Sequence, residues 1–376
     1  MNNKSFKLAT FFNIPVHINF SWFIVLGLVI YTLALGYFPT TNPEQGAAVH
    51  WLMAVIAAIL LFASLLAHEL SHSVVAKRNR LSIRGITLFI FGGVAHMEEE
   101  PPTPAVEFKM AAAGPLMSFF ISLLFFGLTQ AFYNLGFPRT VISITNYLFI
   151  LNLFVGIFNL IPGFPLDGGR ILRAALWQYY KDMRKATAIA SGFGKAFAFF
   201  LMALGFISLF SGSIISGVWF IFIGLFLQEA ADMSYRQLVM KKILSGIRVE
   251  NIMTKILVTV PAGILLNQLV DEYFFKHRYT SFPVIEDDTL LGLVTLHDIK
   301  EVPRERWAET TAKEAMMALG GELVIDKKAD IMEALSKMAA TGFGRLLVIE
   351  DSKLIGIVSQ RDITRLFEFK KEIEGG

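Results

Sequence analysis

The sequence predicts a polytopic α-helical membrane protein that carries a soluble α/β tail, and two observations lead to this prediction. Of the 376 residues, 54% are hydrophobic and only 17% are charged, whereas soluble chains carry about 25% charged residues. The charges are also uneven, because residues 241–376 hold 19 Lys or Arg and 21 Asp or Glu, and residues 1–240 hold only 15 and 10. We therefore expect a membrane domain at 1–240 and a soluble domain at 241–376.

Six stretches are apolar enough to cross a bilayer, which requires roughly 20 residues per helix. They lie at about 16–37, 48–76, 109–134, 142–162, 193–211 and 216–234. Because the number is even, both chain ends are expected on the same side of the membrane. The first seven residues carry two lysines and no cleavage site of small residues, so we expect the first stretch to be retained as a span.

The positive residues predict which side this is, because short cytoplasmic loops are enriched in Lys and Arg. Arg139 is the only such residue in one set of loops, whereas the other set holds Lys4, Lys7, Lys77, Arg78, Arg80, Arg84, Arg170, Arg173, Lys181, Arg184, Lys185, Arg236, Lys241 and Lys242. Both termini and the tail are therefore expected to be cytoplasmic in a cell-membrane protein. Lys195, in the fifth span, is expected to extend to the cytoplasmic interface.

The chain contains no cysteine, which excludes a disulfide framework and thiol catalysis. The second span ends with His68-Glu69-Leu70-Ser71-His72. Residues i and i+4 share a helix face, so both imidazoles can point at one metal ion, and zinc binds imidazole readily. Glu69 is placed to take a proton from water at that metal. A polar helix end is the alternative, but ionisable groups at membrane depth are rare unless they are functional.

A second motif ends the fourth span, from Asn159 to Arg170. It contains two prolines and three glycines, and such irregular backbone is tolerated at membrane depth only inside protein or beside a water-filled cavity. Asp167 in this motif is expected at the same depth as His72, where it can be a third, carboxylate ligand. The alternative is that Asp167 caps a following helix at 168–177.

These two motifs, in this order, resemble the site-2 protease family of intramembrane zinc metalloproteases. The resemblance covers most of residues 10–235 and includes Ala113-Gly114-Pro115 and Ile14-Pro15-Val16-His17. It implies peptide-bond hydrolysis in or near transmembrane segments of membrane-protein substrates. It also implies a zinc ion held by His68, His72 and Asp167.

Two further roles follow from the same resemblance. Glu69 is implied to be the general base. Asn159 matches a family position proposed to contact the substrate or the tetrahedral intermediate, and an interhelical hydrogen bond is the alternative for this side chain.

The segment between the second and third spans, residues 83–97, predicts two short strands around Gly92-Gly93. We expect residues 86–95 to provide an edge on which an extended substrate can pair. The alternative is a hairpin that plugs the site or lies at the membrane interface. His96 with Glu98-Glu99-Glu100 is interpreted as a solvated charge run and not as a second metal site.

The tail contains an internal repeat at about 248–302 and 310–368, and each copy is expected to fold as helix, strand, turn, strand, helix. Both copies carry a Gly-x-x-Thr/Ser-x-x-Asp pattern, which resembles a tandem pair of CBS (cystathionine β-synthase) domains. The resemblance implies that ATP, ADP or AMP binds and regulates the enzyme, and that the chain forms a homodimer. The matching positions are Thr295, Asp298, Ser359 and Asp362, and helix capping is the alternative for Ser359 and Asp362.

Two other functions compete with a protease. A membrane transporter or channel regulated by the tail would use the intramembrane His, Glu and Asp as an ion path. An inactive relative would act as a scaffold, but it would need a missing ligand or base, and none is missing. No nucleic-acid partner is expected.

Overall fold

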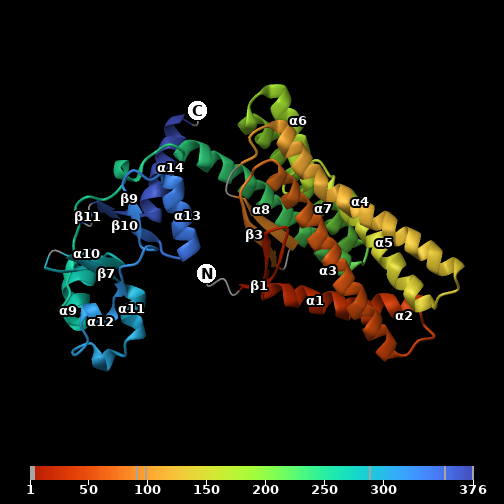
Figure 1. Cartoon of the computed structure of the whole chain (residues 1–376), viewed down its shortest axis with the longest axis horizontal. Helices are drawn as coiled ribbons and strands as arrows, with labels where there is room; N and C mark the ends of the chain where they lie inside the picture. Colours follow the sequence, from red (N-terminus) through yellow and green to blue (C-terminus); the bar gives the residue numbers. More distant parts are fainter. Residues whose placement is uncertain (1–4, 90–91, 98–99, 288, 351–352, 375–376) are drawn as a thin grey trace. The chain divides into compact units, whose positions relative to one another are not determined.

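The computed structural model describes residues 5–89, 92–97, 100–287, 289–350 and 353–374 (Figure 1). The chain divides into two compact units, one that ends at Leu238 and one that begins at Val239. Each unit has its own buried core.

Six helical segments of the described chain are long and apolar enough to cross a membrane, as predicted. The first segment runs through α1 (Ser21–Thr32), a π-helical turn (Leu33–Tyr37) and α2 (Phe38–Thr41). The others are α3 (Ala47–Arg78), α4 (Pro104–Asn134), α5 (Arg139–Asn159), α7 (Met183–Phe210) and α8 (Ile214–Leu244). The first span therefore starts later than residue 16.

That difference arises because the N-terminus forms strands. β1 (Ser5–Phe11), β2 (Ile14–Asn19), β3 (Ile83–Phe89) and β4 (Gly92–Met97) make one sheet in the order β1-β2-β3-β4. The β1–β2 and β3–β4 pairs are antiparallel, and β2 pairs in parallel with β3. Ile14, Val16 and Ile18 face one side of the sheet and are buried there with β3 residues. Two strands of this sheet were predicted, and β1 and β2 were missed.

The helix α3 packs between α1 on one side and the pair α4 and α5 on the other (Figure 1). Small residues on its buried face, Ala54, Ala57 and Ala58, permit this close packing. The Thr103 hydroxyl caps the start of α4 by accepting from the Val106 N–H at 3.3 Å. These contacts place the last turns of α3 beside the first turns of α4.

A short helix, α6 (Asp167–Tyr180), follows α5 after an irregular turn. A Cβ on Gly194 of α7 would lie 2.1 Å from the Phe164 carbonyl oxygen, so α7 contacts the turn at the backbone. Lys195 of α7 forms an ion pair with Asp232 of α8. A carboxylate on the neighbouring helix thus binds its ammonium group, and the extension of Lys195 to the cytoplasmic interface stays a prediction.

The second unit contains the two repeats, and each has the predicted order of helix, two strands and helix. Its described elements are a 3₁₀ turn (Val249–Asn251), β5 (Val260–Pro261), α9 (Leu266–Leu269), a π-helical turn (Val270–Phe274), α10 (Phe275–His277), β6 (Ser281–Glu286), β7 (Thr289–Thr295), α11 (Leu296–Glu301), a 3₁₀ turn (Arg304–Arg306), α12 (Ala312–Ala315), β8 (Met317–Ala318), β9 (Val324–Asp326), α13 (Ile331–Thr341), β10 (Arg345–Glu350), β11 (Lys353–Ser359) and α14 (Gln360–Glu374). The sheets are β5-β6-β7-β8 and β11-β10-β9. Each sheet and its helices enclose a core of hydrophobic side chains.

Candidate metal centre

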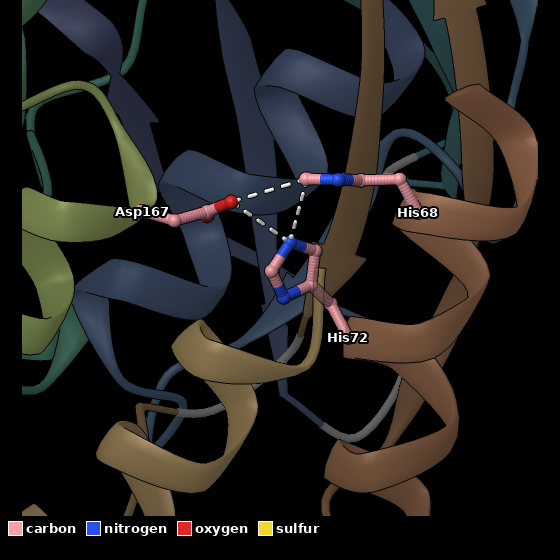
Figure 2. A group of neighbouring side chains, drawn as sticks. All are labelled: His68, His72 and Asp167. Atoms are coloured by element: carbon pink, nitrogen blue, oxygen red, sulfur yellow. Dashed lines mark hydrogen bonds and ion pairs between the residues drawn. The ribbon is translucent and has the colours of Figure 1, made fainter. Parts of the chain in front are cut away.

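Three predicted ligands meet at one point in the membrane unit. The Nε2 atoms of His68 and His72 lie 3.2 Å apart, and each lies 3.1 Å from Oδ2 of Asp167 (Figure 2). Both histidines are buried, and the Asp167 side chain is 14% exposed. The structure thus brings together side chains that are about 95 positions apart in the chain.

Local backbone geometry explains this convergence. His68 and His72 are one turn apart on α3 and face the same side. Asp167 is the first residue of α6, and Leu166, not Asp167, occupies the N-cap position. The alternative role of Asp167 as a helix cap is therefore not seen, because its carboxylate points at the two imidazoles.

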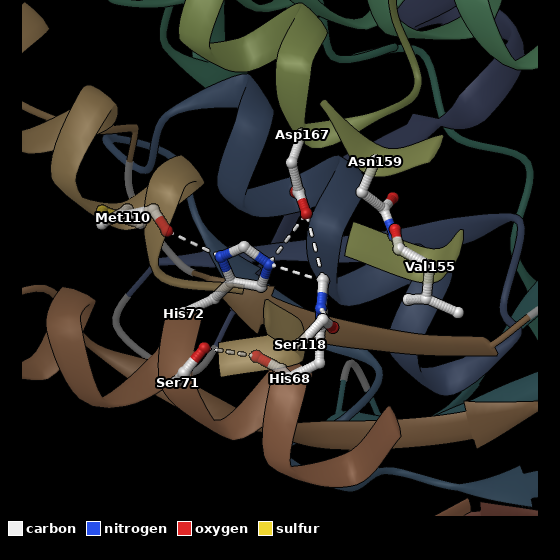
Figure 3. Close-up of polar contacts among 8 residues, drawn as sticks. All are labelled: His68, Ser71, His72, Met110, Ser118, Val155, Asn159 and Asp167. Atoms are coloured by element: carbon white, nitrogen blue, oxygen red, sulfur yellow. Dashed lines mark hydrogen bonds and ion pairs between the residues drawn. The ribbon is translucent and has the colours of Figure 1, made fainter. Parts of the chain in front are cut away.

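The other nitrogen of each imidazole also has a partner (Figure 3). His72 Nδ1 donates to the Met110 carbonyl oxygen at 2.6 Å, and His68 Nδ1 lies 2.8 Å from the Ser118 hydroxyl. A carbonyl can only accept, so in neutral His72 the proton sits on Nδ1 and Nε2 presents a lone pair. Such outer partners orient the imidazoles of metal-ligating histidines.

The donor set suits zinc. Two imidazole nitrogens and one carboxylate oxygen form a three-residue group of the kind found in catalytic zinc sites, which leave one position for water. At zinc–ligand distances of about 2.0–2.1 Å, tetrahedral ligands lie roughly 3.3 Å apart, close to the separations in this group. Without a cation, lone pairs and a carboxylate would face one another in a buried place, which is unfavourable.

Gly114 of α4 closes the group on one side. A Cβ at this position would lie 2.1 Å from His72 Nε2 and 2.5 Å from His68 Nε2. Only glycine lets the α4 backbone approach the imidazoles this closely. The family resemblance pointed to Gly114, but nothing in the residue pattern alone predicts this contact.

The ligand group opens into a cavity of about 630 Å³. Its walls are largely apolar and come from α3, β4, α5, α6 and α8, and Glu69, Asn159 and Arg170 are among its polar lining residues. Asn159 Nδ2 donates to the Val155 carbonyl oxygen of its own helix at 3.0 Å (Figure 3). This bond lies within α5 and does not connect two helices.

The sheet edge beside the cavity differs from the predicted one. Ile86, Thr87 and Leu88 pair with β2 as well as with β4, so β3 is an interior strand. The edge is β4, and a Cβ on Gly93 of this strand would lie 2.5 Å from Glu69 Cγ. The predicted edge at 86–95 is therefore wrong for residues 86–88, and residues 90 and 91 lie outside the described part. The side chain of His96 and residues Glu98 and Glu99 lie outside the described part.

A buried ion pair supports α6 and was not predicted. Arg173 Nε donates to Glu107 Oε1 of α4 at 2.6 Å, and the Arg173 guanidinium lies 5.1 Å from the centre of the Phe164 ring. Glu107 is fully buried. In the sequence, Arg173 was interpreted only as one of the cytoplasmic positive charges, and no pattern linked it to Glu107.

In the tail, the predicted nucleotide-binding side chains form two capping boxes. The Thr295 hydroxyl donates to Asp298 Oδ2 at 2.7 Å, and the Ser359 hydroxyl donates to Asp362 Oδ2 at 2.6 Å. Each hydroxyl also accepts from the backbone N–H of its aspartate at 3.3 Å. Capping, which was the alternative for Ser359 and Asp362, is thus realised, and Thr295 and Asp298 form the same arrangement.

Parts of the chain match two known protein families. Residues 56–139 and 137–204 match peptidase family M50, and residues 249–305 and 321–368 match the CBS domain. The chain is 35% identical to Rip3 of Mycobacterium tuberculosis over 94% of this chain and 90% of that protein. The chain belongs to peptidase family M50. It is a multi-pass membrane zinc metalloprotease of the site-2 type, not a transporter or channel.

Two further similar proteins come from Methanocaldococcus jannaschii. The chain is 33% identical to the zinc metalloprotease MJ0392 of Methanocaldococcus jannaschii over 99% of both chains. It is also similar to the solved structure of a site-2 protease from Methanocaldococcus jannaschii, with 33% identity, a TM-score of 0.43, and coverage of 62% of this chain and 95% of that chain.

Proposed function

We propose that this M50 protease hydrolyses peptide bonds in or near transmembrane segments at the centre formed by His68, His72 and Asp167. The observation that carries the proposal is the convergence of their three ligand atoms beside Glu69 in a largely apolar cavity. A zinc ion held by these three residues would supply Lewis acidity for activating water and for stabilising negative charge on the substrate carbonyl oxygen.

The residues of the chain then handle the protons. Glu69 accepts a proton from the attacking water and passes it to the leaving amine. Ser118 and the Met110 carbonyl hold the two imidazoles in the orientation that keeps both Nε2 atoms directed at the centre. Asn159, once it exchanges its bond with Val155 for one to the substrate, donates to the carbonyl that is attacked.

Glu69→Gln tests the central role. This variant keeps all three ligands and should hold one zinc per chain, but it should cleave a membrane substrate at least a thousandfold more slowly because no base remains. Glu44→Gln, at an exposed loop glutamate, is the matched control. Cleavage by the Glu69 variant at the normal rate would refute the mechanism.

We further propose that β4 binds the unwound substrate as an added strand. The support is that β4 is the edge of its sheet and passes Glu69 at Gly93. In an added strand, only every second residue directs its main-chain N–H and C=O groups toward the strand with which it pairs. N-methylation of successive substrate amides should therefore slow cleavage at alternate positions, and an effect without this alternation would reject docking on β4.

We propose that both termini and the tail are cytoplasmic, as the positive residues indicate. The sheet supports this topology in part. β2 precedes the first two spans and β3 follows them, and because the two strands pair, both must lie on the same side of the membrane. Labelling of single cysteines introduced at Lys185 and Glu44 with a membrane-impermeant reagent tests this. Only the position at Glu44 should react in intact cells.

We propose that the tail binds adenine nucleotides, regulates cleavage and joins two copies of the chain. The support is the resemblance of the two repeats and the position of each hydroxyl and carboxylate at a helix N-terminus, which favours phosphate. A titration of residues 241–376 with ATP, ADP and AMP tests this. Binding that is weakened by Asp298→Ala or Asp362→Ala is expected, and the absence of any affinity would remove the proposal. Light scattering measures the dimer.

A further inference from the structure

The cavity beside the metal centre contains one arginine whose chemistry is not yet used. Arg170 is half-buried and lines the cavity together with Glu69 and Asp167. It follows Asp167 by three positions in α6, so the two side chains project from the same face of the helix. Figure 2 shows Asp167 projecting from this helix toward the histidines.

The next arginine of α6 provides a contrast. Arg173 is bound by Glu107, and the ring of Phe164 covers its guanidinium. Within the described ranges, no hydrogen bond or ion pair reaches the guanidinium of Arg170. Arg173 therefore connects α6 to α4, whereas Arg170 keeps its donors available to a molecule in the cavity.

A guanidinium has five N–H donors, no acceptor, and a permanent charge. In a largely apolar cavity, leaving these donors unpaired is costly, so an occupant that offers oxygen acceptors is favoured. An unwound transmembrane segment supplies main-chain carbonyls that have lost their helical partners. A substrate strand paired along one edge with β4 still has unpaired carbonyls along its other edge.

We propose that Arg170 binds main-chain carbonyl oxygens of the unwound substrate beside the scissile bond. The inference rests on the proposed cleavage at this centre. Arg170 thereby compensates the substrate for the helical hydrogen bonds that it loses on entering the cavity. The contact is made to the backbone, so it accepts segments of different sequence.

The experiment uses the full-length protein in detergent and a synthetic transmembrane substrate. Arg170→Gln should lower kcat/KM about 10- to 100-fold, the range for removing a hydrogen bond to a charged group. Its zinc content should stay at one per chain. Arg170→Lys should restore part of the loss, because ammonium donates but lacks the planar fork. Arg184→Gln, at an exposed arginine, is the control and should match the unaltered enzyme.

A second set of substrates separates this role from a general effect on the centre. In each, one amide near the scissile bond is replaced by a thioamide, whose sulfur is a weak acceptor. At one or two positions, the unaltered enzyme should cleave the thioamide substrate about tenfold more slowly than the normal substrate. The Arg170→Gln variant should cleave these two substrates at the same rate, because the contact that the thioamide weakens is already lost. If the effects of the thioamide and of Arg170→Gln on the cleavage rate multiply at every position, the proposal for Arg170 is wrong. An active Glu69→Gln variant would instead overturn the cleavage mechanism.

Discussion

At the scale of single residues, the metal centre depends on the missing side chain of a glycine as well as on the ligating side chains. Gly114 has no side chain, and this allows the backbone of α4 to lie against both imidazoles. The Met110 carbonyl, one turn earlier in α4, then reaches His72 Nδ1. One helix therefore both orients an imidazole and closes the space around the ligand group.

Gly114→Ala should abolish zinc binding and cleavage. The added methyl group would overlap the Nε2 atoms of His68 and His72. Moving the α4 backbone or the imidazoles apart would break the hydrogen bonds of the imidazoles to Ser118 and Met110. Zinc per chain, measured by mass spectrometry, should fall at least tenfold. Gly127→Ala on the same helix, where a Cβ meets nothing within 4 Å, should retain full zinc content.

At the scale of elements, two ion pairs connect helices of the membrane unit. Glu107 and Arg173 connect α4 with α6, and Lys195 and Asp232 connect α7 with α8. Because Asp167 begins α6, the first pair fixes the helix that carries a candidate ligand. A charge buried without its partner is costly, so the buried Glu107–Arg173 pair is sensitive to the loss of one member.

Arg173→Gln should destabilise the membrane unit by about 3–5 kcal/mol, because it leaves the buried Glu107 carboxylate unpaired. Unfolding in detergent, followed by circular dichroism, measures this. The double variant Glu107→Leu with Arg173→Met should recover most of the loss, since no charge is then buried. Equal losses in the single and double variants would show that the pair does not act through charge.

At the scale of the whole molecule, two units with separate cores share one chain. The core of the second repeat includes Leu244, the last residue of α8, together with Val249. The chain therefore passes from the membrane unit into the tail within one helix. Each unit buries its own apolar residues, so one unit can lose structure while the other stays folded.

Removal of zinc with 1,10-phenanthroline should therefore affect only the membrane unit. Binding to the folded state stabilises it, and chelation removes that contribution. Hydrogen–deuterium exchange should rise in peptides covering 64–76 and 160–175. Peptides covering β6, β7, β10 and β11 should be unchanged, and faster exchange there would show that the two units unfold together.

The sequence predicted those features that depend on short spacing. The i and i+4 histidines, the apolar spans and the repeated tail pattern are all local, and they led to the right fold class. The strand Ile14–Asn19 was missed because its apolar residues continue directly into the first span, and its partner β3 lies about 70 positions later. The partners of Arg173 and Lys195 depend on helix packing, which spacing does not encode.

The parallel pairing of β2 with β3 has a consequence for biogenesis. While the ribosome is still making the second span, β1 and β2 already exist, but the strand that completes their sheet does not. The newly made hairpin must wait, with one edge unpaired, until two helices have entered the bilayer. We infer that the sheet that borders the cavity is assembled only after those helices are inserted, so errors in their insertion would also prevent the cavity wall from forming.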